Sequence, residues 1–100
     1  MWDDKYFLYS NPNKAIENAK KYLGKNTILL KSSKKNKKYS VLNPNTDKFV
    51  HFGQFPYEDY LKHNDEQRKK NYLLRSSKIK GEWKDDKYSA NNLSRNILWS

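Results

Sequence analysis

Two hairpin signals in series constrain the fold of this chain more than any other feature. Branched and aromatic residues gather in three short runs, 27–31 (TILLK), 38–43 (KYSVLN) and 48–53 (KFVHFG). The last two runs are separated by 43–47 (NPNTD), whose composition strongly favours a turn. Short β-rich runs between turn signals predict strands. We therefore expect a three-stranded antiparallel meander in the centre of the chain.

Helical patterns stand on both sides of these strands. Asn11 and Pro12 form a cap and first-turn pair, and Gly24 is a natural helix end. The apolar residues between them fall at helical spacing: Ala15, Ile16, Ala19, Tyr22 and Leu23. A helix is therefore expected from residue 12 to residue 23.

Two more helices are expected after the strands. Asn64 and Gln67 resemble a capping box, with acids in the first turn, and predict a helix to about Ser77. Ser89 predicts the start of a last helix over 90–98, after a loop (79–87) pinned by Trp83. The fold class is thus α+β: one small domain over residues 1–100, with a helix, the meander and two helices in order. Residues 1–10 are expected to form a flexible arm.

Composition excludes several classes of protein. The chain of 100 residues has no cysteine, which rules out disulfides and thiolate metal sites. No apolar run approaches the roughly 20 residues of a membrane span, so no membrane association is expected. The first ten residues are too acidic and too short for a secretory signal, and we expect a protein that is not secreted.

The net charge of +10 favours a polyanionic partner, above all nucleic acid. The excess is concentrated in residues 1–38, where ten lysines face three acids. The stretch 31–38 (KSSKKNKK) reads as a mobile loop that either tracks phosphates or only aids solubility. The candidate nucleic-acid-binding residues are this loop with Tyr39 and one face of the first helix: Lys14, Lys21, Lys25, Lys31, Lys34, Lys35, Lys37, Lys38 and Tyr39.

The segment 51–68 (HFGQFPYEDYLKHNDEQR) is the densest in reactive side chains. His51 and His63 could ligate a metal with Asp59, but their spacing matches no compact metal motif. Neither a metal nor a cofactor is therefore expected. We interpret these side chains, with neighbouring acids and arginines, as a structural polar cluster: His51, Glu58, Asp59, His63, Asp65, Arg68 and Arg75.

Arginine is rare in this lysine-rich chain, and its planar fork suits bidentate contacts. Arg68, Tyr72 and Arg75 share one helical stripe. Either the arginines pair with acids, or they clamp a phosphate while Tyr72 offers a stacking surface. Arg95 is expected to face the last carbonyls of its own helix.

Residues 49–99 resemble a family of short basic proteins of unknown function encoded by giant double-stranded DNA viruses of amoebae and algae, and by some phages. The resemblance rests on HFG, on Y-E-D-Y-x-x-H-x-D-E-x-R, on Y-L-x-R, on a following Trp and on L-S-R-x-x-L-W. It marks 49–99 as the core of the domain. It implies a viral origin and a place in the virion and the infected host cell, with no established reaction.

Three hypotheses follow. The first is a non-enzymatic virion-associated protein that binds nucleic acid, such as DNA, non-specifically through the lysine loop and the first helix. The second is a structural module that binds viral or host proteins or forms a homodimer, with Trp83, Trp99 and tyrosines in the interface. The third is a metal-dependent nuclease that uses His51, His63 and Asp59.

Overall fold

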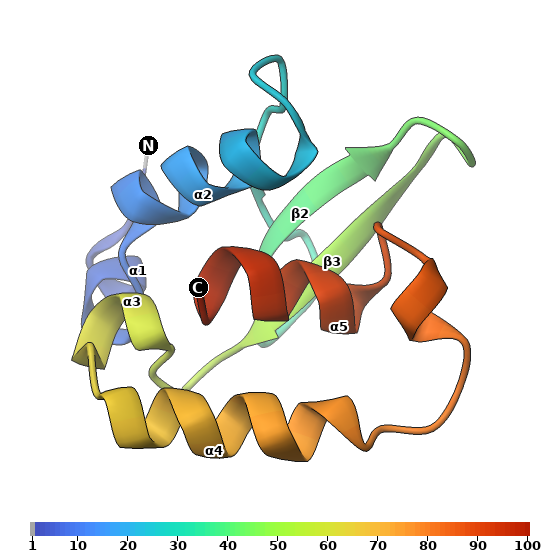
Figure 1. Ribbon diagram of the computed structural model, residues 1–100. Helices are drawn as coiled ribbons and strands as arrows, with labels where there is room; N and C mark the ends of the chain where they lie inside the picture. Colours follow the sequence, from blue (N-terminus) through green and yellow to red (C-terminus); the bar gives the residue numbers. More distant parts are fainter. Residues whose placement is uncertain (1) are drawn as a thin grey trace.

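The computed structural model describes residues 2–100 and has the α+β architecture expected from the sequence. The helices and strands follow in the order α1 (Asp4–Tyr9), α2 (Pro12–Leu23), β1 (Leu30–Lys31), β2 (Lys37–Asn43), β3 (Lys48–Gln54), α3 (Tyr60–His63), α4 (Glu66–Ser77), η1 (Trp83–Asp85), α5 (Ala90–Leu93) and η2 (Ser94–Leu98). η1 is a 3₁₀ turn, and η2 is a π-helical continuation of α5. Figure 1 shows α5 and η2 lying between α2 and α4.

The sheet is the expected antiparallel meander in the order β1-β2-β3. Tyr39 pairs with Phe52 and Val41 with Val50, so these side chains share one face of the sheet. Tyr39, Val41 and Phe52 are no more than 1% exposed and form the centre of the core. β1 is shorter than the predicted strand 27–31, because only Leu30 and Lys31 pair with β2.

The local signals place the helix ends well. The Asn11 side chain accepts a hydrogen bond from the Lys14 amide, and the Gly24 amide bonds to the Lys20 carbonyl. Ser89 caps α5 as expected, by accepting a hydrogen bond from the Asn92 amide. For α4 the cap is Asp65, which accepts from two backbone amides, while the expected cap residue Asn64 instead ends α3 in a left-handed conformation.

The expected flexible arm is wrong for the residues that the structure describes; Met1 lies outside them. Residues 4–9 form α1, and Tyr6 is 6% exposed. Its hydroxyl donates to the Lys38 carbonyl at 2.8 Å, and its ring packs edge-on against Phe55 with the centroids 5.1 Å apart. An aromatic residue buried in this way ties α1 to the sheet and to the connector, residues 55–59, that joins β3 to α3.

The lysine-rich stretch 31–38 is only partly a loop. Lys31 belongs to β1, and Lys37 and Lys38 belong to β2, which leaves 32–36 as the turn. Ser32 organises this turn: its amide bonds to the Lys38 carbonyl at 3.1 Å, and its hydroxyl accepts from the Lys34 amide at 3.0 Å. The turn presents Lys34 and Lys35 to solvent.

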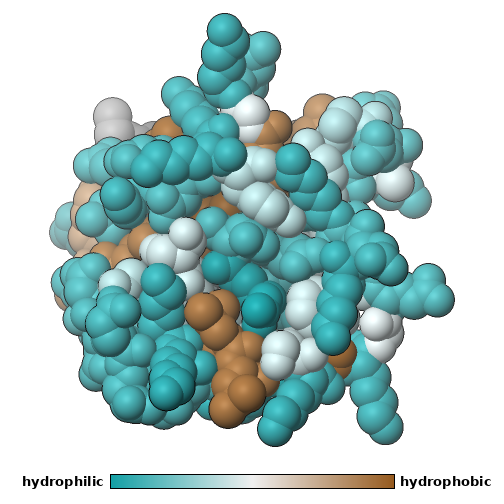
Figure 2. Space-filling view, viewed as in Figure 1, coloured by the Kyte–Doolittle hydropathy of each residue, from teal (hydrophilic) through white to brown (hydrophobic). Residues whose placement is uncertain are grey.

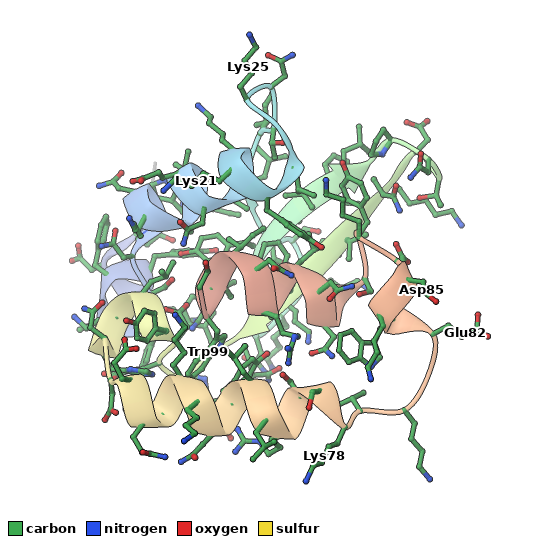
Figure 3. All side chains as sticks on the ribbon, viewed as in Figure 1. Lys21, Lys25, Lys78, Glu82, Asp85 and Trp99 are labelled. Atoms are coloured by element: carbon green, nitrogen blue, oxygen red, sulfur yellow. The ribbon has the colours of Figure 1, made fainter. Side chains whose placement is uncertain are left out.

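The C-terminal segment closes the core. Leu93, Ile97 and Leu98 are no more than 1% exposed, and the Asn18 side chain of α2 donates to the Ile97 carbonyl at 2.9 Å. Trp99 stacks on Tyr72 of α4, with the ring centroids 4.1 Å apart and the planes at 3°. Figure 3 shows Trp99 between the C-terminal helix and α4.

A basic cleft between the sheet, the connector and helix α4

A cleft of about 510 Å³ lies where three parts of the chain meet. One wall comes from the adjoining ends of β2 and β3, the second from the connector after β3, and the third from α4 and η2. Its charged lining residues are four bases and two acids: Lys37, Lys38, Arg68, Arg75, Glu58 and Asp59. The lining therefore has an excess of two positive charges.

The deepest charged residues of the cleft form a buried ion pair. Lys38 Nζ lies 3.2 Å from Asp59 Oδ2, and both side chains are 2% exposed. Lys38 Nζ also donates to the carbonyls of Tyr9 at 2.9 Å and Tyr57 at 2.6 Å. These three acceptors match the three protons of an ammonium group, which makes the buried charge tolerable.

Burial opposes the charge on both partners of this pair. It lowers the pKa of Lys38, an effect that the Asp59 carboxylate partly offsets. It raises the pKa of Asp59, while Lys38, the Ser10 hydroxyl and the Lys62 amide act in the other direction. Asp59 Oδ1 has no hydrogen-bond partner at normal distance among residues 2–100. The pair joins β2 to the connector and fixes the floor of the cleft.

Gly53 allows this arrangement. It adopts a φ of +82°, and a Cβ atom there would lie 3.0 Å from both Leu98 Cδ1 and Lys38 Cβ. A larger residue would thus combine an unfavourable backbone conformation with crowding of Lys38. Because Gly53 has no side chain, Leu98 and the aliphatic part of the Lys38 side chain can pack directly against its backbone.

The arginines of α4 occupy the wall opposite the sheet. Arg68 lies 3.5 Å from Glu58, a half-exposed pair of modest strength. The Arg75 side chain is exposed and forms no ion pair or hydrogen bond with any residue between 2 and 100. The pairing interpretation therefore fits Arg68, while Arg75 is available to a ligand. Trp99 covers one face of the Tyr72 ring, so that face is not open to a stacking ligand.

Two residues placed among the nucleic-acid-binding candidates are wrong. Lys38 is 1% exposed and holds the ion pair with Asp59, and Tyr39 is fully buried with its hydroxyl on Ser10 Oγ at 2.8 Å. Burial raises the pKa of Tyr39 well above its ordinary value. The two side chains point to opposite faces of β2, and both faces are covered at this point, so neither side chain is open to a polyanion.

The remaining candidate lysines are divided between two sides of the molecule. Lys14 and Lys21 both pair with Glu17, at 3.4 Å and 3.2 Å, and Lys31 pairs with Asp3 at 3.1 Å. Figure 3 shows Lys21 and Lys25 projecting on the α2 side, opposite Lys78 at the end of α4. By contrast, Lys37 lines the cleft itself, in the same strand end that follows the exposed turn lysines. The turn 32–36 and the cleft thus form one basic surface, and helix α2 is not part of it.

The expected polar cluster is not one cluster. Asp59, Glu58, Arg68 and Arg75 line the cleft. His51 lies apart from them on β3, where its Nδ1 atom is 2.7 Å from Ser32 Oγ. Partial burial and the nearby Lys34 and Lys37 lower the pKa of His51. It therefore belongs to the lysine turn.

His63 and Asp65 form a local structure at the start of α4. His63 Nδ1 accepts a hydrogen bond from the Asp65 amide at 3.0 Å, which places the ring proton on Nε2 in the neutral form. Nε2 is buried without a partner among residues 2–100, and the ring packs 5.2 Å from Trp99. Burial, with a smaller contribution from Arg68, lowers the pKa of His63.

The proposed metal ligands do not converge. Within residues 2–100, no three histidine, cysteine, aspartate or glutamate side chains are close enough to hold a metal ion. His51 bonds to Ser32, His63 to the Asp65 amide, and Asp59 to Lys38. The nuclease hypothesis therefore lacks the ligand set on which it rested. Along the same residues, the structure has no helix long and apolar enough to cross a membrane.

Sequence reasoning missed Tyr57 and Asn71 as cleft residues. Tyr57 is 67% exposed and lies on the connector wall. Asn71 lies between Arg68 and Arg75 on the exposed face of α4. The spacing of Asn71 from Arg68 and Arg75, three and four residues, is a signal that could have found it. Tyr57 had no comparable signal, because nothing local predicts where the connector lies.

The fold and the cleft define the class of protein: a small α+β domain with a basic cleft beside its sheet. The model of a family of unknown function (DUF5754) matches residues 28–76. This segment runs from the first strand to the end of α4, and so contains every charged residue of the cleft. Neither a curated protein nor a solved structure gives a significant match to the chain.

Proposed function

We propose that this protein binds nucleic acid with little sequence specificity, through the basic cleft and the adjoining turn 32–36. The cleft carries the proposal: its lining has an excess of two positive charges, and its cations that are not paired with its acids are Lys37 and Arg75. Lys34 and Lys35 extend this charge on the turn. Phosphates are the natural partners of such exposed lysines and arginines, and the interaction needs no base readout.

The proposal involves no catalysis. The acids of the cleft are already engaged: Asp59 by Lys38 and Glu58 by Arg68. Their contacts give them a structural role, and the nucleic-acid contacts come from Lys34, Lys35, Lys37 and Arg75. The hypothesis from sequence combined the lysine loop with the helix over 12–23, which is α2. The present proposal replaces α2 by the arginine face of α4 and keeps the turn.

Affinity measured across a salt series tests this function. Fluorescence anisotropy with a labelled duplex should show affinity that falls steeply as salt rises, with a log–log slope of about −0.9 for each phosphate contact. Replacing Lys34, Lys35 and Lys37 by glutamine should flatten the slope. Replacing Lys14, Lys21 and Lys25 removes the same charge from the other side and serves as the matched control.

The two variants give opposite outcomes if the surface is placed correctly. If the slope stays unchanged in the turn variant and becomes flatter in the α2 variant, the binding site lies on α2 instead. Absence of binding to either duplex or single strand at low salt would exclude the function altogether.

We further infer a viral, virion-associated protein that acts in the infected host cell. The support is the resemblance of residues 49–99 described above, together with a lysine- and asparagine-rich composition typical of an A/T-rich genome. Quantitative mass spectrometry of purified virions tests the placement. Detection only in infected-cell lysate, and never in virions, would contradict it.

A protein-interaction role is the second candidate, and an apolar groove favours it. The groove has a volume of about 790 Å³ and lies beside the short strand β1, at the other end of the sheet from the basic cleft. Its exposed apolar residues are Ile28, Leu30, Leu42 and Phe49. The tryptophans named from sequence are a poorer choice, since Trp99 stacks on Tyr72 and Arg95 packs on the Trp83 ring.

Sedimentation at several concentrations tests this second role for self-association. A dimer that Phe49→Asp converts to a monomer would support an interface at the groove. The hydropathy surface in Figure 2 shows a mainly hydrophilic face with an apolar patch over α4. Leu74, a residue of α4, is 59% exposed. Leu74→Asp is therefore a suitable control for a patch elsewhere.

A further inference from the structure

The cleft contains an exposed aromatic side chain that the fold itself does not use. Tyr57 is 67% exposed, yet it lies in the wall of the cleft. Within residues 2–100 its ring has no aromatic partner and no cation over it, whereas Tyr72 and Trp99 stack on each other. An exposed tyrosine with free ring faces has no role in packing.

The backbone of Tyr57 is nonetheless held in place. Its carbonyl accepts a hydrogen bond of 2.6 Å from the buried Lys38 ammonium, and its amide bonds to the Gln54 carbonyl at 3.2 Å. The ring therefore projects from an anchored position. A pre-positioned aromatic side chain loses little freedom when a flat ligand stacks on it.

Cationic groups line the same cleft. Arg68 and Arg75 lie two helical turns apart on one stripe of α4, with Asn71 between them. Lys37 contributes from the sheet side, where its ammonium is 3.5 Å from Gln54 Oε1. The cleft thus brings together phosphate-binding groups and a free aromatic face. This combination is typical of sites that bind single-stranded nucleic acid.

From this combination we propose that the cleft prefers single-stranded nucleic acid: one unpaired nucleotide enters, its base stacks on Tyr57, and its phosphate contacts Arg75. The inference rests on the proposed function and adds the strand class to it. A duplex keeps its bases paired and stacked, so it can offer phosphates but no open base face. The volume of about 510 Å³ suits a ligand of small-molecule size, such as one nucleotide.

Anisotropy with a labelled oligothymidylate, alone or annealed to oligodeoxyadenylate, tests the preference. The wild type should bind the single strand more tightly than the duplex at the same salt concentration. Tyr57→Ala should weaken single-strand binding by about fivefold or more, and leave duplex binding unchanged. Tyr57→Phe should keep the wild-type affinity. Phe49→Ala, which removes an exposed aromatic ring outside the cleft, is the matched control.

The salt dependence separates stacking from charge. Tyr57→Ala removes no cationic group and should leave the slope of the salt series unchanged, whereas Arg75→Gln should flatten it by about 0.7. Equal affinity for both strand forms, or an equal loss for both in Tyr57→Ala, would overturn the strand preference and leave the proposed function standing. Absence of binding to both forms at low salt would overturn both proposals.

Discussion

Replacing Lys38 by methionine is the sharpest test of how the cleft is built. The change keeps most of the side-chain volume and removes the ammonium that donates to Tyr9, Tyr57 and Asp59. Both partners of the ion pair are 2% exposed, so Asp59 would be left buried without its counter-charge. Breaking a buried pair from one side costs about 3–5 kcal/mol. Because burial raises the pKa of Asp59, the carboxyl left without Lys38 can take up a proton, and we expect the lower end of that range.

The assay is equilibrium unfolding by urea and by heat. A loss of about 3 kcal/mol corresponds to a fall in Tm of roughly 12–24 °C for a domain of this size. Lys31→Met is the control, since Lys31 pairs with Asp3 on the surface, with side chains 39% and 70% exposed. Such a pair is worth at most about 1 kcal/mol.

A double variant distinguishes the unpaired charge from the lost packing. Lys38→Met with Asp59→Leu removes both charges, and it should be more stable than Lys38→Met alone, since no carboxylate is left buried without its counter-charge. Equal losses for Lys38→Met and Lys31→Met would refute the assignment of the pair as a structural element, as would a double variant that is less stable than the single one.

Three further predictions concern separate parts of the fold. Gly53→Ala should lower the free energy of unfolding in urea by about 1–3 kcal/mol, because Gly53 has a positive φ and a new Cβ would crowd Lys38 Cβ. An unchanged free energy of unfolding would contradict this reasoning. Arg95→Gln should lower the free energy of unfolding by about 1–2 kcal/mol, because Arg95 donates to the Leu73 carbonyl at 2.7 Å and to Ser76 near the end of α4. Amide hydrogen exchange should become faster in the last turn of α4, and an equal increase along the whole chain would contradict this role. Burial lowers the folded-state pKa of His63 below its ordinary 6.5, so the contribution of this residue to the free energy of unfolding should be fully present above about pH 6.5. It should decline as the pH falls from 6.5 toward the folded-state pKa. His63→Gln should remove that part of the pH dependence of unfolding, and an unchanged profile would exclude His63 as its source.

Local signals predicted the elements that local chemistry determines. Asn11, Pro12 and Gly24 lie within the turns that they begin or end, so α2 has the expected bounds. The turn 43–47 is likewise stabilised by its own residues. Asn43 Oδ1 accepts a hydrogen bond from the Asn45 amide at 2.9 Å, and Asp47 adopts a φ of +60°. These features depend on neighbours in sequence, which a single sequence displays.

Distant contacts determine the elements that the sequence did not reveal. The six residues of α1 are too few for a helical pattern, and Tyr6 is placed by a bond to a residue 32 positions away. Arg95 was expected at its own helix end, whereas its partner carbonyl is 22 positions away, near the end of α4.

The candidate site was predicted in part. Arg68, Arg75 and Asp59 were named, and they do line one cleft. Lys38 was assigned to the solvent because five lysines in eight residues suggest a loop. Only the strand register, which sets Lys38 near Gly53, shows that one of the five turns inward. Charge density in a sequence does not distinguish the lysine that is buried from those that are exposed.

The hydrogen bond between Asn18 and the Ile97 carbonyl has a consequence for how the domain is made. It joins residues 79 positions apart, and the side chains around it complete the core only when the last helical turn is present. During synthesis, α2 and the sheet must therefore remain without their final packing partner until the ribosome has released the end of the domain. Because contacts of such long range form late, the core of this domain closes only after its last helical turn has been synthesised.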